Sequence, residues 1–170
     1  EATRVSDVGD DPRSVSARMA IRRALDDILM TPGFHRVSTT WTRESNDGHE
    51  LIMLQRSRWA SVVYVNVGVH YLPLEPRFGG HVADCHVRTR LESLVGFTPD
   101  VAESLDLLSP LSDHERGYRV ADAVTRLALP WLEGIRDVGN AGTFLQRRTS
   151  KAVILAPPVR AALVADQRPN

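Results

Sequence analysis

The stretch VVYVNVGVHY, residues 62–71, decides the fold. Apolar side chains recur at every second position, as in a β-strand that buries one face. The apolar face comprises Val63, Val65, Val67, Val69 and Tyr71. The opposite face carries Val62, Tyr64, Asn66, Gly68 and His70. Antiparallel sheets tolerate one face in water, so we expect helices on the valine face and solvent on the other.

Further strands are predicted on both sides of this stretch. Residues 34–44 are rich in threonine and aromatic side chains, which favour strands, and residues 51–55 continue the pattern. The intervening Asn-Asp-Gly at 46–48 is typical of a tight hairpin, because these residues readily adopt positive φ. Residues 85–94 could form a fourth strand. Short connections favour an antiparallel β-meander.

Helical periodicity flanks the strands. Apolar residues at intervals of three and four predict a helix that begins at Ser14 or Ser16, with Ser14 as a cap, and stops at Pro32 and Gly33. A second helix is predicted over residues 115–135, where Pro130 would kink or split it, and a short one over residues 141–148. The expected fold class is therefore α+β, with one antiparallel sheet of about four to five strands and helices packed on one face.

Length and composition set the domain organisation. A chain of 170 residues is the size of one domain. We expect a flexible acidic arm over residues 1–13, a single domain over residues 14–165 and a tail over residues 166–170. Residues 150–165 fit either strand or helix.

The composition also argues against several classes of protein. No run approaches the roughly 18–20 apolar residues of a membrane helix. A single cysteine, Cys85, cannot form an internal disulfide, which favours a reducing cytoplasmic location. The 21 basic residues balance 21 acidic ones, which argues against nucleic-acid binding. Phosphate-binding, dinucleotide-binding and Gly-x-Ser-x-Gly motifs are absent, so we expect no cofactor.

Several short motifs, in this order, resemble the bacterial "domain of unknown function 4304" family. The motifs are GFHR at 33–36, WTR at 41–43, LQRSRW at 54–59, YVNVGV at 64–69, CHVRTRL at 85–91 and LPWL at 129–132. The similarity extends over residues 14–148. Because the family has no established activity, the resemblance implies a fold and a lineage but no catalytic residues. Small orphan domains of this size often occur beside toxins as immunity or interaction proteins.

Two pairs of arginines make the main candidate binding surface. Alternate residues on a strand share a face, so two such pairs on one sheet would form a cationic strip. A planar guanidinium suits carboxylates and phosphates, so the strip could bind an anionic ligand or an acidic partner. The alternative is a solvated face whose arginines pair with nearby carboxylates. The candidate binding residues are Arg56, Arg58, Trp59, Asn66, His70, Arg88 and Arg90.

The three tryptophans are expected in the core or at its edge. Trp59 would be an exception if it were exposed at a hairpin bend next to Arg58. Tryptophan and arginine dominate the energetic hot spots of protein interfaces, so an exposed Trp59 would indicate a binding role.

The densest group of potential metal ligands is His70, His81, Cys85 and His86. Zinc accepts imidazole and thiolate, but the paired spacings of zinc motifs do not occur, so we predict no metal site and retain these four only as weak candidates. Cys85 could act as a nucleophile only with a nearby base and a lowered pKa. The alternative is a buried structural thiol.

The leading functional hypothesis is a non-catalytic module that binds another protein through the polar sheet face, with an immunity or accessory role in a bacterial conflict system as its most concrete form. The alternative is a small-molecule-binding protein or hydrolase with a pocket between the sheet and the 72–84 loop, where the four candidate ligands would converge. We expect no membrane partner. Nucleic-acid binding is the third hypothesis, because the net charge of the chain is zero.

Overall fold

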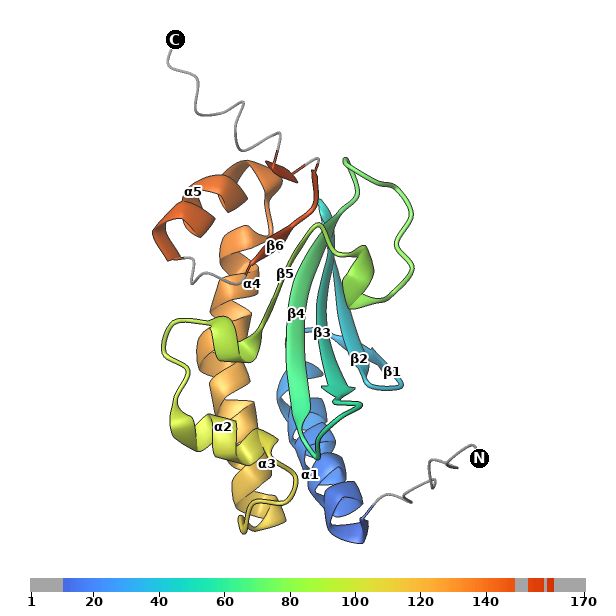
Figure 1. Cartoon of the computed structure of the whole chain (residues 1–170). Helices are drawn as coiled ribbons and strands as arrows, with labels where there is room; N and C mark the ends of the chain where they lie inside the picture. The colour runs from blue at the N-terminus through green and yellow to red at the C-terminus, as the bar shows by residue number, and fades with distance from the viewer. Residues whose placement is uncertain (1–10, 149–152, 158, 161–170) are drawn as a thin grey trace, which may run out of the picture.

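The computed structural model describes residues 11–148, 153–157 and 159–160. Within them, six strands form one sheet in the order β1-β2-β3-β4-β5-β6 (Figure 1). Each strand pairs antiparallel with its neighbour in sequence, so the sheet is the predicted meander. The strands are β1 (His35–Val37), β2 (Thr40–Ser45), β3 (Gly48–Arg56), β4 (Val63–Tyr71), β5 (Val87–Arg90) and β6 (Ile154–Leu155). The predictions for residues 1–10 and for the 166–170 tail lie outside the described residues.

Helices cover one face of this sheet, as expected for the α+β class (Figure 1). The α-helices are α1 (Pro12–Leu29), α2 (Pro99–Leu105), α3 (Asp113–Ala123), α4 (Leu129–Ile135) and α5 (Val138–Arg148). Shorter helical turns are η1 (Val82–Asp84), η2 (Leu91–Ser93) and the π-helical η3 (Val124–Ala128). In the described part of the chain, no helix combines the length and the apolar character needed to cross a bilayer.

The predicted count of four to five strands is too low. The single strand expected over residues 34–44 is two strands, because Ser38 has a φ of 58° and forms a two-residue turn with Thr39 between β1 and β2. Serine gives a weak signal for such a turn, since positive φ is usually supplied by glycine or asparagine. The sixth strand, β6, lies in the segment that fits either strand or helix from sequence.

The hairpin predicted at residues 46–48 forms, but for a different reason. Gly48 pairs with Ser45 as the first residue of β3, and its φ is not positive. A Cβ added to Gly48 would lie 1.8 Å from the main-chain oxygen of His70. The glycine is therefore required for close approach of β3 to β4 rather than for turn conformation.

The valine face of β4 forms the main core, as predicted. All five of its alternating side chains are completely buried among apolar residues of α1, α3 and α4. Several polar contacts tie this layer to the sheet, among them the following two. The Trp41 indole N–H donates to Asp26 of α1 at 2.9 Å, and Arg136, after α4, donates to the buried Glu50 of β3 at 2.7 Å.

The helices differ from prediction in several respects, including the start of α5 at Val138 rather than at residue 141. Asp11, not Ser14, caps α1, and its carboxylate accepts from the Arg13 N–H at 2.9 Å; the helix therefore begins inside the predicted arm. Helix α2 lies between the predicted fourth strand and second helix, where none was predicted. Pro130 does not split the second helix, because α3, η3 and α4 follow one another without a gap. Just before Pro130, the π-helical η3 shifts the bonding so that the Leu129 N–H bonds to the Val124 oxygen, five residues back.

The second face of the sheet is only partly solvated, contrary to prediction. The loop that joins β4 to β5, residues 72–86, folds back across the sheet and carries η1 (Figure 1). Leu51 and Met53 of β3 form a small second core with Val82 and Cys85 of this loop, and Phe78 packs against it. The loop therefore divides the second face into a covered part, an open part near the β3–β4 hairpin, and cavities on its two sides.

Candidate functional site

The turn between β3 and β4, residues 57–61, presents an almost fully exposed tryptophan. Trp59 is 94% exposed, more than any other large hydrophobic side chain in the described residues. The turn is anchored at its base, where the Ser57 N–H donates to the Val62 oxygen at 2.9 Å. The Leu107 N–H donates to the Ser61 oxygen at 2.8 Å. The indole is thus held in water by an ordered turn, which we call the hairpin tip.

Basic side chains accompany Trp59 at the hairpin tip. Arg58 precedes it within the turn, and Arg56 ends β3; both are exposed. The other tryptophans, Trp41 and Trp131, are buried, as predicted for core positions. Trp59 therefore meets the condition under which the sequence predicts a binding role.

The four predicted arginines do not form one strip. Arg88 pairs with Gly68 and Arg90 with Asn66, which places both arginines on the second face. Arg56 pairs with Val63, a residue of the helix-covered face, and Arg58 lies beyond the end of the strand. Because side chains alternate with a period of two, this register sets Arg56 on the other side of the sheet from the β5 arginines.

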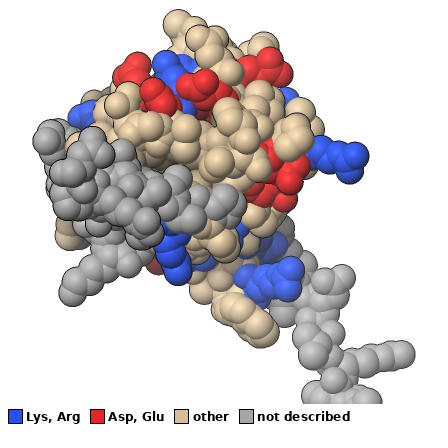
Figure 2. Space-filling view, turned by 90° about the horizontal axis from the view of Figure 1, so that it is seen from above, with Lys and Arg blue, Asp and Glu red and all other residues tan. Residues whose placement is uncertain are grey.

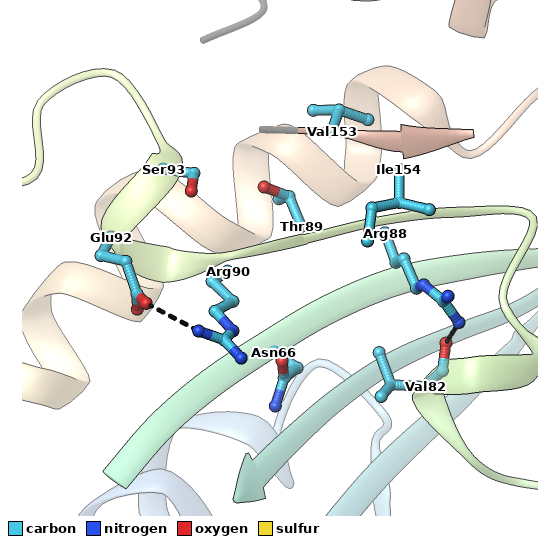
Figure 3. A pocket seen from close by; sticks show the side chains of 9 residues that line it. All are labelled: Asn66, Val82, Arg88, Thr89, Arg90, Glu92, Ser93, Val153 and Ile154. Atoms are coloured by element: carbon cyan, nitrogen blue, oxygen red, sulfur yellow. Dashed lines mark hydrogen bonds and ion pairs between the residues drawn. The ribbon is translucent and has the colours of Figure 1, made fainter. Parts of the chain in front are cut away.

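The β5 arginines line a cavity of about 470 Å³ (Figure 3). Among the described residues, the pairing of β5 with β6 covers Val87 and Arg88. The cavity lies beside this part of β5. We call it the β5 cavity; its lining residues are Asn66, Val82, Arg88, Thr89, Arg90, Glu92, Ser93, Val153 and Ile154.

Neighbouring groups hold the polar side chains of the β5 cavity in place. The Arg90 guanidinium lies 4.1 Å from the centre of the Tyr64 ring. Arg88 donates from Nη1 to the main-chain oxygens of Val82, at 3.3 Å, and Ala83, at 2.7 Å. Asn66, only 6% exposed, donates to the Gln55 side chain at 3.0 Å. These contacts reduce the conformational freedom that a ligand would otherwise have to remove.

The four weak metal candidates do not converge. His81 caps η1 and accepts the Ala83 N–H at 3.0 Å on its Nδ1 atom. Cys85 packs in the small second core, and burial raises the pKa of its thiol to about 12, so it is not a reactive thiolate. Among the described residues, no three His, Cys, Asp or Glu side chains are grouped as a metal site.

His70 and His86 do meet, in a cluster of rings under the loop. Their ring centres are 4.6 Å apart, and His49 and Phe78 stack beside them at 4.6 Å from each other. His70 is 1% exposed, and neither of its ring nitrogens has a hydrogen-bond partner among the described residues. The Nδ1 atom of His86 accepts the Tyr71 N–H at 3.0 Å. We call His49, His70, Phe78 and His86 the histidine cluster.

Burial lowers the pKa of both buried histidines. For His70, loss of hydration is the largest cause of the lower pKa, followed by the charge of His49. For His86, burial again comes first in lowering the pKa, followed by the charge of His70. Both rings are therefore neutral near pH 7 and serve as packing surfaces for the loop.

A second cavity, of about 480 Å³, lies between the sheet and the loop, next to His49 and Phe78 of the histidine cluster. Its lining residues are His35, Val37, Thr40, Thr42, Glu44, His49, Phe78, Gly79 and Gly80. It matches the predicted position of a pocket beside the 72–84 loop. The residues proposed to converge there do not line it.

The sequence did not reveal several residues of these sites. Glu92, Ser93 and His49 were not predicted, because their positions depend on how η2 and the loop fold onto the sheet. The alternation that set Arg88 and Arg90 on one face was the available signal for Glu92, two residues further on.

At the end of the molecule that carries α5 and β6, Figure 2 shows basic and acidic side chains interspersed, in line with the zero net charge.

A family comparison covers most of these features. The model of the family described as "Domain of unknown function (DUF4304)" matches residues 25–134, well over half of the chain. The chain belongs to the DUF4304 family. No curated protein and no solved structure gives a significant match. The DUF4304 match includes the hairpin tip, the histidine cluster and β5, whereas Val153 and Ile154 of the β5 cavity lie beyond it.

Proposed function

We propose that this DUF4304 chain is a non-catalytic protein-binding module whose main contact is the hairpin tip. The exposure of Trp59 carries the proposal: 94% of a large aromatic side chain stands in water on an anchored turn. Removing that area from water on binding is favourable, and tryptophan loses little conformational entropy in doing so. Trp59 is therefore the expected hot spot of an interface.

The charges beside Trp59 indicate the chemistry of the partner. Arg58 lies in the hairpin tip and Arg56 ends β3 just before it; both are basic and exposed. A complementary surface has an apolar recess for the indole and carboxylates around it. An immunity or accessory role in a conflict system is a concrete form of this function. The raised pKa of the Cys85 thiol argues against this one residue as a nucleophile.

The test is a tagged pull-down from lysate of the source organism, read by mass spectrometry. Wild type is compared with Trp59→Ala and with Tyr118→Ala, which removes another exposed aromatic side chain, on α3. We expect a discrete protein that is recovered by wild type and Tyr118→Ala and lost with Trp59→Ala. Equal recovery by all three proteins would contradict the assignment of the hairpin tip.

A second candidate function is small-molecule binding between the sheet and the 72–84 loop. The cavity of about 480 Å³ at that position favours it. Its lining offers threonine hydroxyls, two imidazoles and the Glu44 carboxylate beside the Phe78 ring, a mixture typical of small-molecule sites. A hydrolase is less well supported, because the proposed nucleophile and bases do not converge there.

A thermal-shift screen of metabolites tests this second candidate. A true ligand is expected to raise the melting temperature of wild type and of Arg126→Gln, an exposed control on η3, but not of Thr42→Val. A ligand that stabilises the Thr42→Val protein equally would be bound elsewhere.

A further inference from the structure

The β5 cavity carries charges of both signs, which its arginines alone do not explain. Figure 3 shows the Arg90 side chain between Glu92 and Asn66, with Arg88 further along β5 and directed toward η1. Among the described residues, the hydrogen-bond partners of the Arg88 guanidinium are neutral main-chain oxygens and not a carboxylate. The cavity therefore combines two cations and one carboxylate.

Glu92 and Arg90 do not satisfy each other. Their closest atoms, Arg90 Nη1 and Glu92 Oε1, are 3.6 Å apart, beyond hydrogen-bond distance, and both side chains are partly exposed. The other oxygen, Glu92 Oε2, is buried and has no hydrogen-bond partner among the described residues. Leaving a buried carboxylate oxygen without a hydrogen-bond donor is unfavourable. A ligand that brings a donor to this atom would remove that cost.

The rest of the β5 cavity is suited to an apolar group. Val82, Val153 and Ile154 contribute aliphatic side chains from η1, from the residue before β6 and from β6 itself. A volume of about 470 Å³ lies within the usual range of small-molecule sites. The cavity thus joins a cation, a carboxylate that lacks a donor and an aliphatic wall.

We propose that the β5 cavity binds a free α-amino acid with an apolar side chain. The ligand carboxylate binds the Arg90 guanidinium in the positive field of Arg88, the ammonium group donates to Glu92 Oε2, and the side chain packs on the aliphatic wall. A simple carboxylic acid would leave Glu92 without a donor and in repulsion with the ligand. A simple amine would face two arginines. A zwitterion satisfies both signs of charge.

The test is calorimetric titration of the purified chain with L-leucine and two analogues. The first analogue, 4-methylpentanoate, lacks the ammonium group, and the second, 3-methylbutylamine, lacks the carboxylate. We expect saturable binding of L-leucine and at least about tenfold weaker binding of each analogue, since each loses one charge-assisted contact.

Variants assign the two contacts. Arg90→Gln is expected to weaken binding of both L-leucine and 4-methylpentanoate, whereas Glu92→Gln weakens only L-leucine. Arg126→Gln, an exposed arginine paired with Asp122 on the helical layer, is the matched control and leaves both affinities unchanged. Circular dichroism confirms that the variants are folded.

The absence of saturable L-leucine binding would overturn the proposal. Equal affinity for L-leucine and 4-methylpentanoate, or an unchanged L-leucine affinity in Glu92→Gln, would also overturn it, because Glu92 would then have no role in recognition. None of these results depends on Trp59, so the protein-binding function is tested separately.

Discussion

The two faces of the sheet are built on different principles. The helix-covered face is continuous and apolar: the valine row of β4 is completely buried beneath α1, α3 and α4. The second face is a mosaic in which a loop seals a small apolar core and a histidine cluster, while the hairpin tip and two cavities border it. The first face holds most of the buried apolar side chains, while the histidine cluster and both cavities belong to the second.

The difference follows from the side chains that β4 offers to each face. The helix side receives a uniform row of branched apolar residues, which any amphipathic helix can cover. The second side receives Tyr64, Asn66, Gly68 and His70, which differ in size and polarity. Each therefore has its own partner: Arg90 stacks on Tyr64, Gln55 accepts from Asn66, Cys85 packs over Gly68, and His86 packs against His70.

Adjacent residues of β3 give the largest expected contrast. Ile52 faces the main core and Met53 the small one, and both are buried. We expect Ile52→Ala to lower the free energy of unfolding by about 4 kcal/mol and Met53→Ala by about 2 kcal/mol, because the small core can collapse around the gap. Urea unfolding monitored by circular dichroism measures both. Equal losses would show that the two faces contribute alike.

Gly68 sharpens the comparison on the second face. A Cβ at this position would lie 2.8 Å from the Cβ and 2.9 Å from the sulfur of Cys85. Gly68→Ala should therefore cost about 1–3 kcal/mol of unfolding free energy through overpacking. Adding Cys85→Gly removes those two close contacts, so the double variant should lose less stability than the two single losses combined. Strict additivity in urea unfolding would contradict direct packing of the loop on β4.

The histidine cluster makes the second face sensitive to pH. Burial holds the pKa values of His70 and His86 below the ordinary value of 6.5, so the unfolded chain binds protons in a range where the folded chain does not. Stability contributed by the cluster is full above about pH 6.5 and is lost as the pH falls toward the folded pKa values. Urea unfolding at a series of pH values measures this loss.

A pair of variants assigns that pH dependence. His70→Phe keeps a ring of similar size without a titratable group, and we expect it to show a smaller loss of stability below pH 6.5 than wild type. His114→Ala, at an exposed position on α3, should follow the wild-type curve. A His70→Phe curve that superimposes on wild type would remove His70 from the cause.

The sequence was informative where local periodicity decides structure. The alternation in residues 62–71 correctly predicted the buried face of β4, and the three- and four-residue spacing predicted α1. The sequence could not predict that the 72–86 loop covers part of the second face. That coverage depends on contacts between residues distant in sequence, such as Cys85 on Gly68. The predicted arginine strip does not form, because Arg56 faces the other side of the sheet from Arg88 and Arg90. Only the register of β3 with β4 decides which face Arg56 takes.

The most direct test of the protein-binding function is the affinity of the purified partner for matched variants, measured by isothermal titration calorimetry. If Trp59 is the hot spot, Trp59→Ala should weaken binding by about 30-fold or more, which corresponds to about 2 kcal/mol, while Tyr118→Ala leaves the affinity within about twofold. An unchanged affinity with Trp59→Ala, or an equal loss in the two variants, would contradict recognition through the hairpin tip.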